Sequence, residues 1–468
     1  MTSTTTISRG LRPRLGAALG LAAAALIAAC SSSPEATTGT TTSSGTAAGG
    51  GGGGSDPGAC NKAPPSGFTA AVAPSTDGTL GLDTAMVADE NGDPMIAYQW
   101  FEPGGDLAAT TVYFTRWDRC AGAFTAPVKV DTVGGVSTNN PTKRIALSYE
   151  IAAKKLAIAY EVVFVAPGFE NNPSNGIYLQ TSTDQGATWA GKLHVSDQKD
   201  GDIQQAKGPA VAVSGGMIHL AYAQENRDCC RLAEPDCGSC SSVWYLEGDG
   251  TTFSRVQVSD AGGPVQVAGQ VLSLAVDSAG KPALAFFGAP PQGYTTTALY
   301  WRPGGAPVKV MDSSEVQNDD PSLSLAFDGT RPRLAAHLVA DESADYDLRF
   351  SASDDGVTWG APVKLPRDKS DYTAWYQSLA VDAKGGAAVS AYINGGSGDS
   401  LCGGPRIVRS SDLQAWTACG ADQEKKYPEI GGKYVDSYFT HEDKLTLGFT
   451  GTLGGDQSGS GVLLWREP

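Results

Sequence analysis

The sequence predicts an all-β protein, a seven-bladed β-propeller whose blades are four-stranded antiparallel sheets. Three observations carry this prediction. One unit recurs seven times at intervals of about 50 to 65 residues, a repeat length typical of propellers and solenoids. Each unit contains short apolar runs separated by turn residues, as a four-stranded blade requires. A further strand-like segment precedes the first unit and completes the last one.

The second strand of each unit is the easiest to locate, because a short apolar run ends in a small residue followed by an aromatic residue or histidine. Successive copies lie 62, 62, 64, 51, 55 and 57 residues apart, which defines seven blades. The copies end at Ala97-Tyr98, Ala159-Tyr160, Ala221-Tyr222, Ala285-Phe286, Ala336-His337, Ala391-Tyr392 and Gly448-Phe449. Turns such as Asn91-Gly92 join first and second strands as hairpins.

A third strand follows in every unit, for example residues 112–115 and 177–180, and a fourth follows in residues 124–130. The seventh unit has no fourth strand of its own. Residues 68–73 resemble residues 124–130 but precede the first unit, so we expect them to complete the seventh blade. Such closure of the ring also removes an exposed sheet edge.

Composition limits the partners. The chain has 34 Lys and Arg against 50 Asp and Glu, a formal net charge of −16. Binding to the phosphate backbone depends on a surplus of basic residues, so we expect no nucleic-acid partner. No Gly-rich phosphate loop, Gly-x-Ser-x-Gly elbow or His-Glu-x-x-His motif occurs in the sequence, so we expect no cofactor.

The N-terminal segment predicts export. Basic residues precede a 15-residue apolar stretch, residues 15–29, and Cys30 follows it. A membrane-spanning helix needs about 20 apolar residues, so this stretch is short for a span. It resembles a bacterial lipoprotein signal, which implies cleavage before Cys30 and lipidation of its thiol. An ordinary secretory signal is the alternative. Ser31 resembles the residue after the cysteine in lipoproteins sorted to the outer membrane.

Residues 31–58 are almost wholly Ser, Thr, Gly and Ala, a composition that predicts a disordered tether. The expected organisation is a signal peptide at 1–29, a lipidated cysteine and tether at 30–58, and the propeller at 59–468. We expect a monomer that contacts the membrane through its lipid anchor only.

Eight cysteines remain besides Cys30, an even number in an exported chain, and this favours disulfides. A bond between Cys60 and Cys120 would join the closing segment to the first blade, and Cys402 and Cys419 lie within one blade. The other four, Cys229, Cys230, Cys237 and Cys240, crowd one loop of the third blade. A zinc cage is their alternative, although adjacent cysteines fit the usual paired spacing poorly.

In a four-stranded blade, the first strand begins and the second strand ends on the same side of the ring. Polar side chains there would surround one mouth of the central axis, so we expect the ligand site at this mouth. The candidate residues are Asp83, Arg144, Glu161, His337, Arg349, Tyr376, Arg406 and Asp436. Asp83 and Asp436 come from adjacent blades and could form a general acid/base pair. The arginines are alternatively surface ion-pair partners, and His337 a packed counterpart of the tyrosines in other blades.

Between third and fourth strands, residues 182–189 match the Asp-box pattern Ser-x-Asp-x-Gly-x-Thr-Trp. Residues 352–359 match all but the first position, with Asp354 as the aspartate, and residues 410–416 are a copy one residue short. Such a turn needs an aspartate to accept backbone N–H bonds and a glycine with positive φ. The repeats identify the chain as similar to Asp-box propellers of the sialidase superfamily.

The second blade resembles sialidases most closely. Residues 144–147 resemble the Arg-Ile-Pro segment that opens a sialidase's first blade, and residues 156–161 resemble the strand that follows it. Ala146 replaces the proline, Val163 stands where the family has a second arginine, and residues 171–175 contain no aspartate at the acid/base position. Tyr376, Tyr434 and Glu225 are available for a nucleophile pair, but none can be assigned to it.

Three functions fit these observations. The first is a surface propeller that binds an extracellular glycan. The second is an enzyme that cleaves glycans, either a sialidase-like hydrolase with Arg144, Arg349 and Arg406 on the substrate carboxylate, or a lyase with Tyr376 and His337. The third is a scaffold that binds proteins. The first is preferred, because the acid/base and nucleophile positions of an enzyme are not convincingly present.

Overall fold

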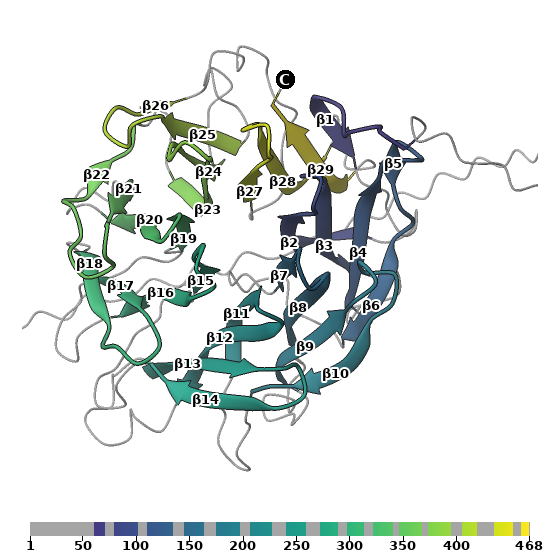
Figure 1. The fold of residues 1–468 in the computed structure, drawn as a ribbon, viewed down its shortest axis with the longest axis horizontal. Helices are drawn as coiled ribbons and strands as arrows, with labels where there is room; N and C mark the ends of the chain where they lie inside the picture. Colours follow the sequence, from purple (N-terminus) through teal and green to yellow (C-terminus); the bar gives the residue numbers. More distant parts are fainter. Residues whose placement is uncertain are drawn as a thin grey trace, which may run out of the picture. The chain divides into compact units, whose positions relative to one another are not determined.

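The computed structural model describes residues 60–70, 79–101, 110–133, 145–162, 175–196, 206–226, 240–258, 272–288, 297–312, 322–339, 346–366, 373–394, 405–418, 435–452 and 460–467. The predicted signal peptide, lipidated cysteine and tether lie outside these residues. Seven antiparallel sheets make up the described fold and confirm the predicted propeller (Figure 1). Among the described residues, no helix is long and apolar enough to cross a membrane.

Each blade uses strands in chain order, except that the seventh takes its outer strand from the N-terminal side. Blades one to three comprise β2 (Thr79–Ala88), β3 (Pro94–Phe101), β4 (Thr110–Asp118), β5 (Ala123–Phe124) and β6 (Val128–Val133); β7 (Ile145–Glu150), β8 (Lys155–Val162), β9 (Gly176–Ser182) and β10 (Ala190–His194); and β11 (Ala206–Ser214), β12 (Met217–Asn226), β13 (Cys240–Gly248) and β14 (Phe253–Gln257).

The remaining four blades follow the same plan. They comprise β15 (Ser273–Val276), β16 (Pro282–Gly288), β17 (Thr297–Trp301) and β18 (Val308–Asp312); β19 (Ser322–Asp328), β20 (Arg331–Val339), β21 (Tyr346–Ala352) and β22 (Val363–Lys364); β23 (Thr373–Val381), β24 (Ala387–Asn394), β25 (Pro405–Ser410) and β26 (Thr417–Ala418); and β27 (Val435–Phe439), β28 (Leu445–Thr452), β29 (Ser460–Arg466) and β1 (Gly67–Ala70).

The fourth strand of blade one differs from the expected single run over residues 124–130. Two strands, β5 and β6, pair with successive parts of β4 instead. Pro127 lies between them, and proline has no N–H to donate to a ladder. The break therefore falls where the backbone cannot continue pairing.

The predicted ring closure is confirmed. β1 pairs antiparallel with β29, with Phe68 opposite Trp465. The residues just before β1 attach to both neighbouring blades, because the Arg466 guanidinium donates to the Pro64 carbonyl at 3.2 Å and the Trp117 indole donates to the Lys62 carbonyl at 2.6 Å. The predicted disulfide between Cys60 and Cys120 is also present.

The first strands form the inner layer of the ring. Each contacts the first strand of the next blade, in the order β2, β7, β11, β15, β19, β23 and β27, and β27 contacts β2 again (Figure 1). At five junctions, a side-chain oxygen accepts the backbone N–H of the next first strand at 2.9 to 3.0 Å. The acceptor and donor residues are Ser148 and Val213, Ser273 and Leu325, Ser324 and Leu379, Ser378 and Ser437, and Asp436 and Met86.

Apolar side chains fill the spaces between neighbouring sheets. The aromatic residues that end the second strands are central to this core, and Tyr98, Tyr160, Tyr222, Phe286 and Phe449 are all 0 to 1% exposed. The repeat pattern is thus a packing pattern, because each of these five aromatic residues inserts its ring between two blades.

The Asp box of blade two forms the predicted turn. Asp184 Oδ1 accepts the Thr188 N–H at 2.9 Å, and the Thr188 hydroxyl donates to Oδ2 at 2.5 Å. These bonds, the hydroxyl bond foremost, lower the pKa of Asp184 to about 2. Gly186 has φ of 85° and donates its N–H to the Ser182 hydroxyl at 2.9 Å. Aspartate and glycine therefore perform the roles that the pattern predicts.

The Asp box of blade five has a different register from the predicted one. Asp355, rather than Asp354, accepts the N–H groups of Val357 and Thr358, at 2.8 and 2.7 Å. Ser353 takes the serine position and accepts the Gly356 N–H at 2.9 Å. This box is one residue shorter than that of blade two, as is the box of blade six, where Asp412 is the acceptor.

Each Asp-box tryptophan packs against the preceding blade. Trp189 contacts Phe114 of β4 with ring centroids 5.3 Å apart. The equivalent pairs in blades five and six are Trp359 with Tyr300 at 5.3 Å and Trp416 with Phe350 at 4.8 Å. The Asp boxes of blades two, five and six therefore join neighbouring blades, which gives them a structural role without assigning them any chemistry.

Candidate functional site

The mouth is defined here as the side of the ring where first strands begin and second strands end. Three first strands are irregular there. The register shifts between Leu80 and Thr84 in β2, between Lys207 and Ala210 in β11, and between Trp375 and Ser378 in β23. Bulges change the direction of side chains and are frequent beside binding and active sites. Two predicted site residues, Asp83 and Tyr376, lie within these irregular segments.

Charged side chains are buried at the mouth. Glu161, at the end of β8, is 1% exposed, and its Oε2 accepts the Gly208 N–H of β11 at 3.2 Å. Asp83 is 2% exposed and Lys207 is 8% exposed. Burial of a charge is costly unless the group is bonded. The bond to Glu161 also ties the second strand of blade two to the irregular part of β11, so it joins two neighbouring blades at the mouth.

Hydrogen bonds between Gln377 and Ser322 join blades five and six. The Gln377 amide of β23 donates to the Ser322 carbonyl at 2.5 Å and to the Ala335 carbonyl at 3.2 Å. The Ser322 hydroxyl in turn donates to the Gln377 amide oxygen. His337 pairs with Ser322 in the ladder and is fully buried. His337 therefore occupies the position of the second-strand aromatic residues and is covered from solvent.

Asp436 lies at the junction of blades seven and one. Its Oδ2 accepts the Met86 N–H of β2 at 3.0 Å, and the residue is half-buried. The structure thus brings Asp436 against the strand that carries Asp83, as expected for residues of adjacent blades. The bond to Met86 is one of the five hydrogen bonds described above that join neighbouring first strands.

Two of the predicted arginines, Arg349 and Arg406, lie on the third strands of their blades. Arg349 is in β21, opposite Ala336, and Arg406 is in β25, opposite Ala391. Both are third strands, two strand spacings or roughly 10 Å from the first strands of their blades. Arg144 directly precedes β7 and lies outside the described residues. The structure therefore does not place Arg349 and Arg406 beside Asp83 and Tyr376 on the inner layer.

Six other cysteines were expected to form disulfides. Cys240 begins β13, and the other five lie outside the described residues: Cys229, Cys230, Cys237, Cys402 and Cys419. In the described part of the chain, no group of three or more His, Cys, Asp or Glu side chains could hold a metal ion.

Sequence reasoning missed Lys207 and Gln377, because single polar residues inside apolar strands carry no repeat signal. Gly208-Pro209 was a usable sign of the irregularity in β11, since Gly208 has φ of 58° and proline cannot donate to the ladder. A missed turn in blade three also resembles an Asp box: Asp249 accepts the N–H groups of Thr251 and Thr252 at 2.7 and 3.0 Å.

No protein-family model matches the sequence, and no curated protein is significantly similar to it. Among solved structures, a protein of unknown function from Dyadobacter fermentans is 13% identical with a TM-score of 0.47, over 86% of this chain and 97% of its own. A Penicillium chrysogenum α-L-arabinanase complexed with arabinobiose is 13% identical with a TM-score of 0.45, over 86% and 98%. A Trypanosoma rangeli sialidase is 12% identical with a TM-score of 0.43, over 69% and 55%. These similarities are too distant to carry the neighbours' activities to this chain.

Proposed function

We propose that this protein is an exported lipoprotein whose propeller binds a glycan at the mouth. The observation that supports the site is the irregularity of three first strands on that side of the ring, with the charged side chains of Asp83, Glu161 and Lys207 buried there. Hydrogen bonds of Glu161 and Gln377 tie β11 to blade two and β23 to blade five. A site held in its binding geometry before the ligand arrives loses less free energy to ordering.

In this proposal, residues at the starts of the first strands contact the ligand directly. Arg144 directly precedes β7, and a guanidinium can make paired hydrogen bonds to a carboxylate or to hydroxyl groups. Tyr376 lies in the irregular segment of β23, and an aromatic ring offers an apolar face with a polar edge to a sugar. An anionic or hydroxyl-rich sugar fits this pair of side chains.

Burial favours binding over cleavage. A general acid or base must come within hydrogen-bond reach of the substrate. The predicted carboxylates Asp83 and Glu161 are 2% and 1% exposed, and His337 is fully buried. These groups hold the strands at the mouth in place and do not exchange protons with a bound sugar.

We expect Arg144→Ala to weaken glycan binding by about tenfold to a hundredfold, because loss of a hydrogen bond to a charged group costs roughly 1.5 to 3 kcal/mol. A glycan array with the wild type should first identify ligands, and titration with the best ligand should then compare the variants. Arg331→Ala is the matched control, because Arg331 is exposed in the hairpin on the other side of the ring and pairs with Asp328. Unchanged binding by folded Arg144→Ala would refute this site, and hydrolysis of a fluorogenic sialoside by the wild type would refute binding without cleavage.

The lipid anchor has its own test. We expect wild-type protein expressed in a bacterium with an outer membrane to incorporate labelled palmitate and to fractionate with that membrane. Cys30→Ala should lose the label and leave the membrane fraction, because the proposed attachment thiol is gone. Label on the Cys30→Ala protein, or a wild type recovered wholly in the soluble fraction, would contradict the anchor.

A further inference from the structure

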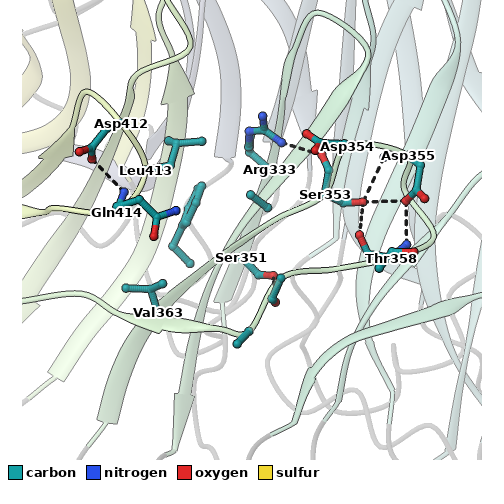
Figure 2. Close-up of a pocket in the computed structure, with 14 residues that line it drawn as sticks. Arg333, Ser351, Ser353, Asp354, Asp355, Thr358, Val363, Asp412, Leu413 and Gln414 are labelled. Carbon is teal, nitrogen blue, oxygen red and sulfur yellow. Dashed lines mark hydrogen bonds between the residues drawn. The ribbon is translucent and has the colours of Figure 1, made fainter.

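A groove with a volume of about 740 Å³ lies between blades five and six, on the side of the ring opposite the mouth. The Asp-box turns of the two blades form its facing walls. Figure 2 shows Asp412, Leu413 and Gln414 on one side and Arg333, Asp354 and Asp355 on the other. The groove is therefore a product of the spacing between two successive Asp boxes and is separate from the proposed glycan site.

The carboxylates on both walls are held in fixed positions. Asp355 Oδ1 accepts two backbone N–H groups at 2.7 and 2.8 Å, and Asp412 Oδ1 accepts two at 2.9 Å. Backbone N–H bonds, from Thr358 and Ala415 foremost, lower the pKa of Asp355 and Asp412. Both carboxylates are exposed and are ionised at neutral pH, and Asp354 adds a third exposed acidic side chain beside them.

The lining between these carboxylates contains apolar side chains beside polar ones. Phe350, Val363 and Leu413 contribute the apolar part, and Phe350 is only 1% exposed. In the same turn as Asp355, Val357 is 68% exposed. The groove thus combines negative edges with aliphatic surface.

Arg333 lies at the back of the lining. The residue is 3% exposed, and its guanidinium donates to the Ser353 carbonyl at 2.6 Å and to Asp328 at 3.2 Å. Asp328 also pairs with Arg331, and the charge of Arg333 interacts with that of Asp354. Arg333 therefore offsets part of the negative charge of this wall, and the three exposed carboxylates of the groove still outnumber it.

We propose that this groove binds an extended, lysine- or arginine-rich segment of a protein partner. The aliphatic stem of a lysine or arginine covers apolar surface while its charged end reaches outward, which matches Val363 and Leu413 between the acidic walls. A glycan fits less well, because the one aromatic ring that lines the groove, Phe350, is buried and offers no face for stacking.

The test uses a fluorescein-labelled peptide of alternating lysine and threonine, titrated with the full chain at low and moderate salt. We expect saturable binding that Asp354→Asn together with Asp412→Asn weakens by about tenfold, because the two substitutions remove two of the three exposed negative charges that attract the peptide. Asparagine retains the acceptor oxygen of the turn in blade six. Ala361→Arg, which places a bulky cation at an exposed position of the lining, should abolish binding without touching either turn.

Asp184→Asn is the matched control, because it makes the same substitution in the Asp box of blade two. We expect peptide affinity within twofold of wild type for this variant and for Arg144→Ala, which alters only the proposed glycan site. Equal losses from Asp184→Asn and from the blade-five and blade-six variants would show a nonspecific charge effect and overturn the proposal. Absence of peptide binding, or glycan binding that Ala361→Arg abolishes, would overturn it as well. Arg144→Ala changes only the glycan site, and Ala361→Arg changes only the groove. The peptide titration therefore tests the groove, and the glycan titration tests the mouth, independently of each other.

Discussion

Deleting residues 60–70 should abolish the cooperative unfolding transition of the propeller. The deletion removes β1, the strand that completes blade seven, and exposes the edge of β29. It also removes the Cys60–Cys120 disulfide, whose sequence separation is 60 residues. Closing a loop of that length stabilises a folded chain by about 4 kcal/mol in the chain-entropy model. Since a domain is stable by only about 5 to 15 kcal/mol, loss of the bond and the strand together should exceed what the ring can tolerate.

Thermal unfolding followed by circular dichroism, with a dye that binds exposed apolar surface, measures this effect. The matched control is deletion of residues 31–57, which is of greater length but removes only the Ser-, Thr- and Gly-rich segment. We expect the control to unfold within a few degrees of the full chain. A cooperative transition at the wild-type midpoint after deletion of residues 60–70 would show that the ring does not depend on its closing strand.

The blades could be predicted from sequence because the aromatic residues of the repeat, among the described residues, insert large side chains between two sheets. Tyr160 and Phe449 are buried at equivalent positions of their blades although 289 residues separate them, so the repeated sequence pattern reflects a repeated packing requirement. The closing strand could be predicted for the same reason, since residues 68–73 had an apolar pattern but no blade of their own.

The Asp-box register of blade five could not be read from the pattern, because Ser353-Asp354-Asp355 offers two aspartates in succession. Only the hydrogen bonds to Val357 and Thr358 distinguish them. The one-residue deletion is accommodated because Gly356, with φ of 76°, directly follows the accepting aspartate. A fixed pattern assumes a fixed turn length, and this family of turns has two.

The mouth was predicted from topology alone, which identifies the side of the ring but not the depth of each side chain. Glu161 and His337 were candidates to face a ligand, and the structure buries both, with His337 at the packed position that was its alternative. Glu161 is held by a contact between blades, because its carboxylate accepts the Gly208 N–H of β11 beside the register shift of that strand. Such contacts join segments that are far apart in sequence and leave no local signal.

Replacement of Phe114 by alanine should be among the most destabilising single substitutions in the fold. The ring is 1% exposed and lies under the Asp box of blade two, where it contacts Trp189 with centroids 5.3 Å apart. Truncation of a buried phenylalanine typically costs about 3 to 5 kcal/mol, because apolar contacts are lost and a cavity remains. Denaturant titration of Phe114→Ala measures the loss in free energy of unfolding.

A double-mutant cycle separates the contribution of the Asp box from that of general burial. If Trp189 fastens blade two to blade one through Phe114, the two alanine substitutions should be coupled by about 0.5 to 1.5 kcal/mol, the value for aromatic pairs. Phe114→Ala with Trp359→Ala is the control cycle, because Trp359 contacts Tyr300 in blade four and shares no partner with Phe114. Those substitutions should add within about 0.5 kcal/mol. Equal coupling in both cycles would mean that the Asp-box tryptophans stabilise the ring as a whole, and zero coupling in the first would mean that Trp189 does not link the two blades.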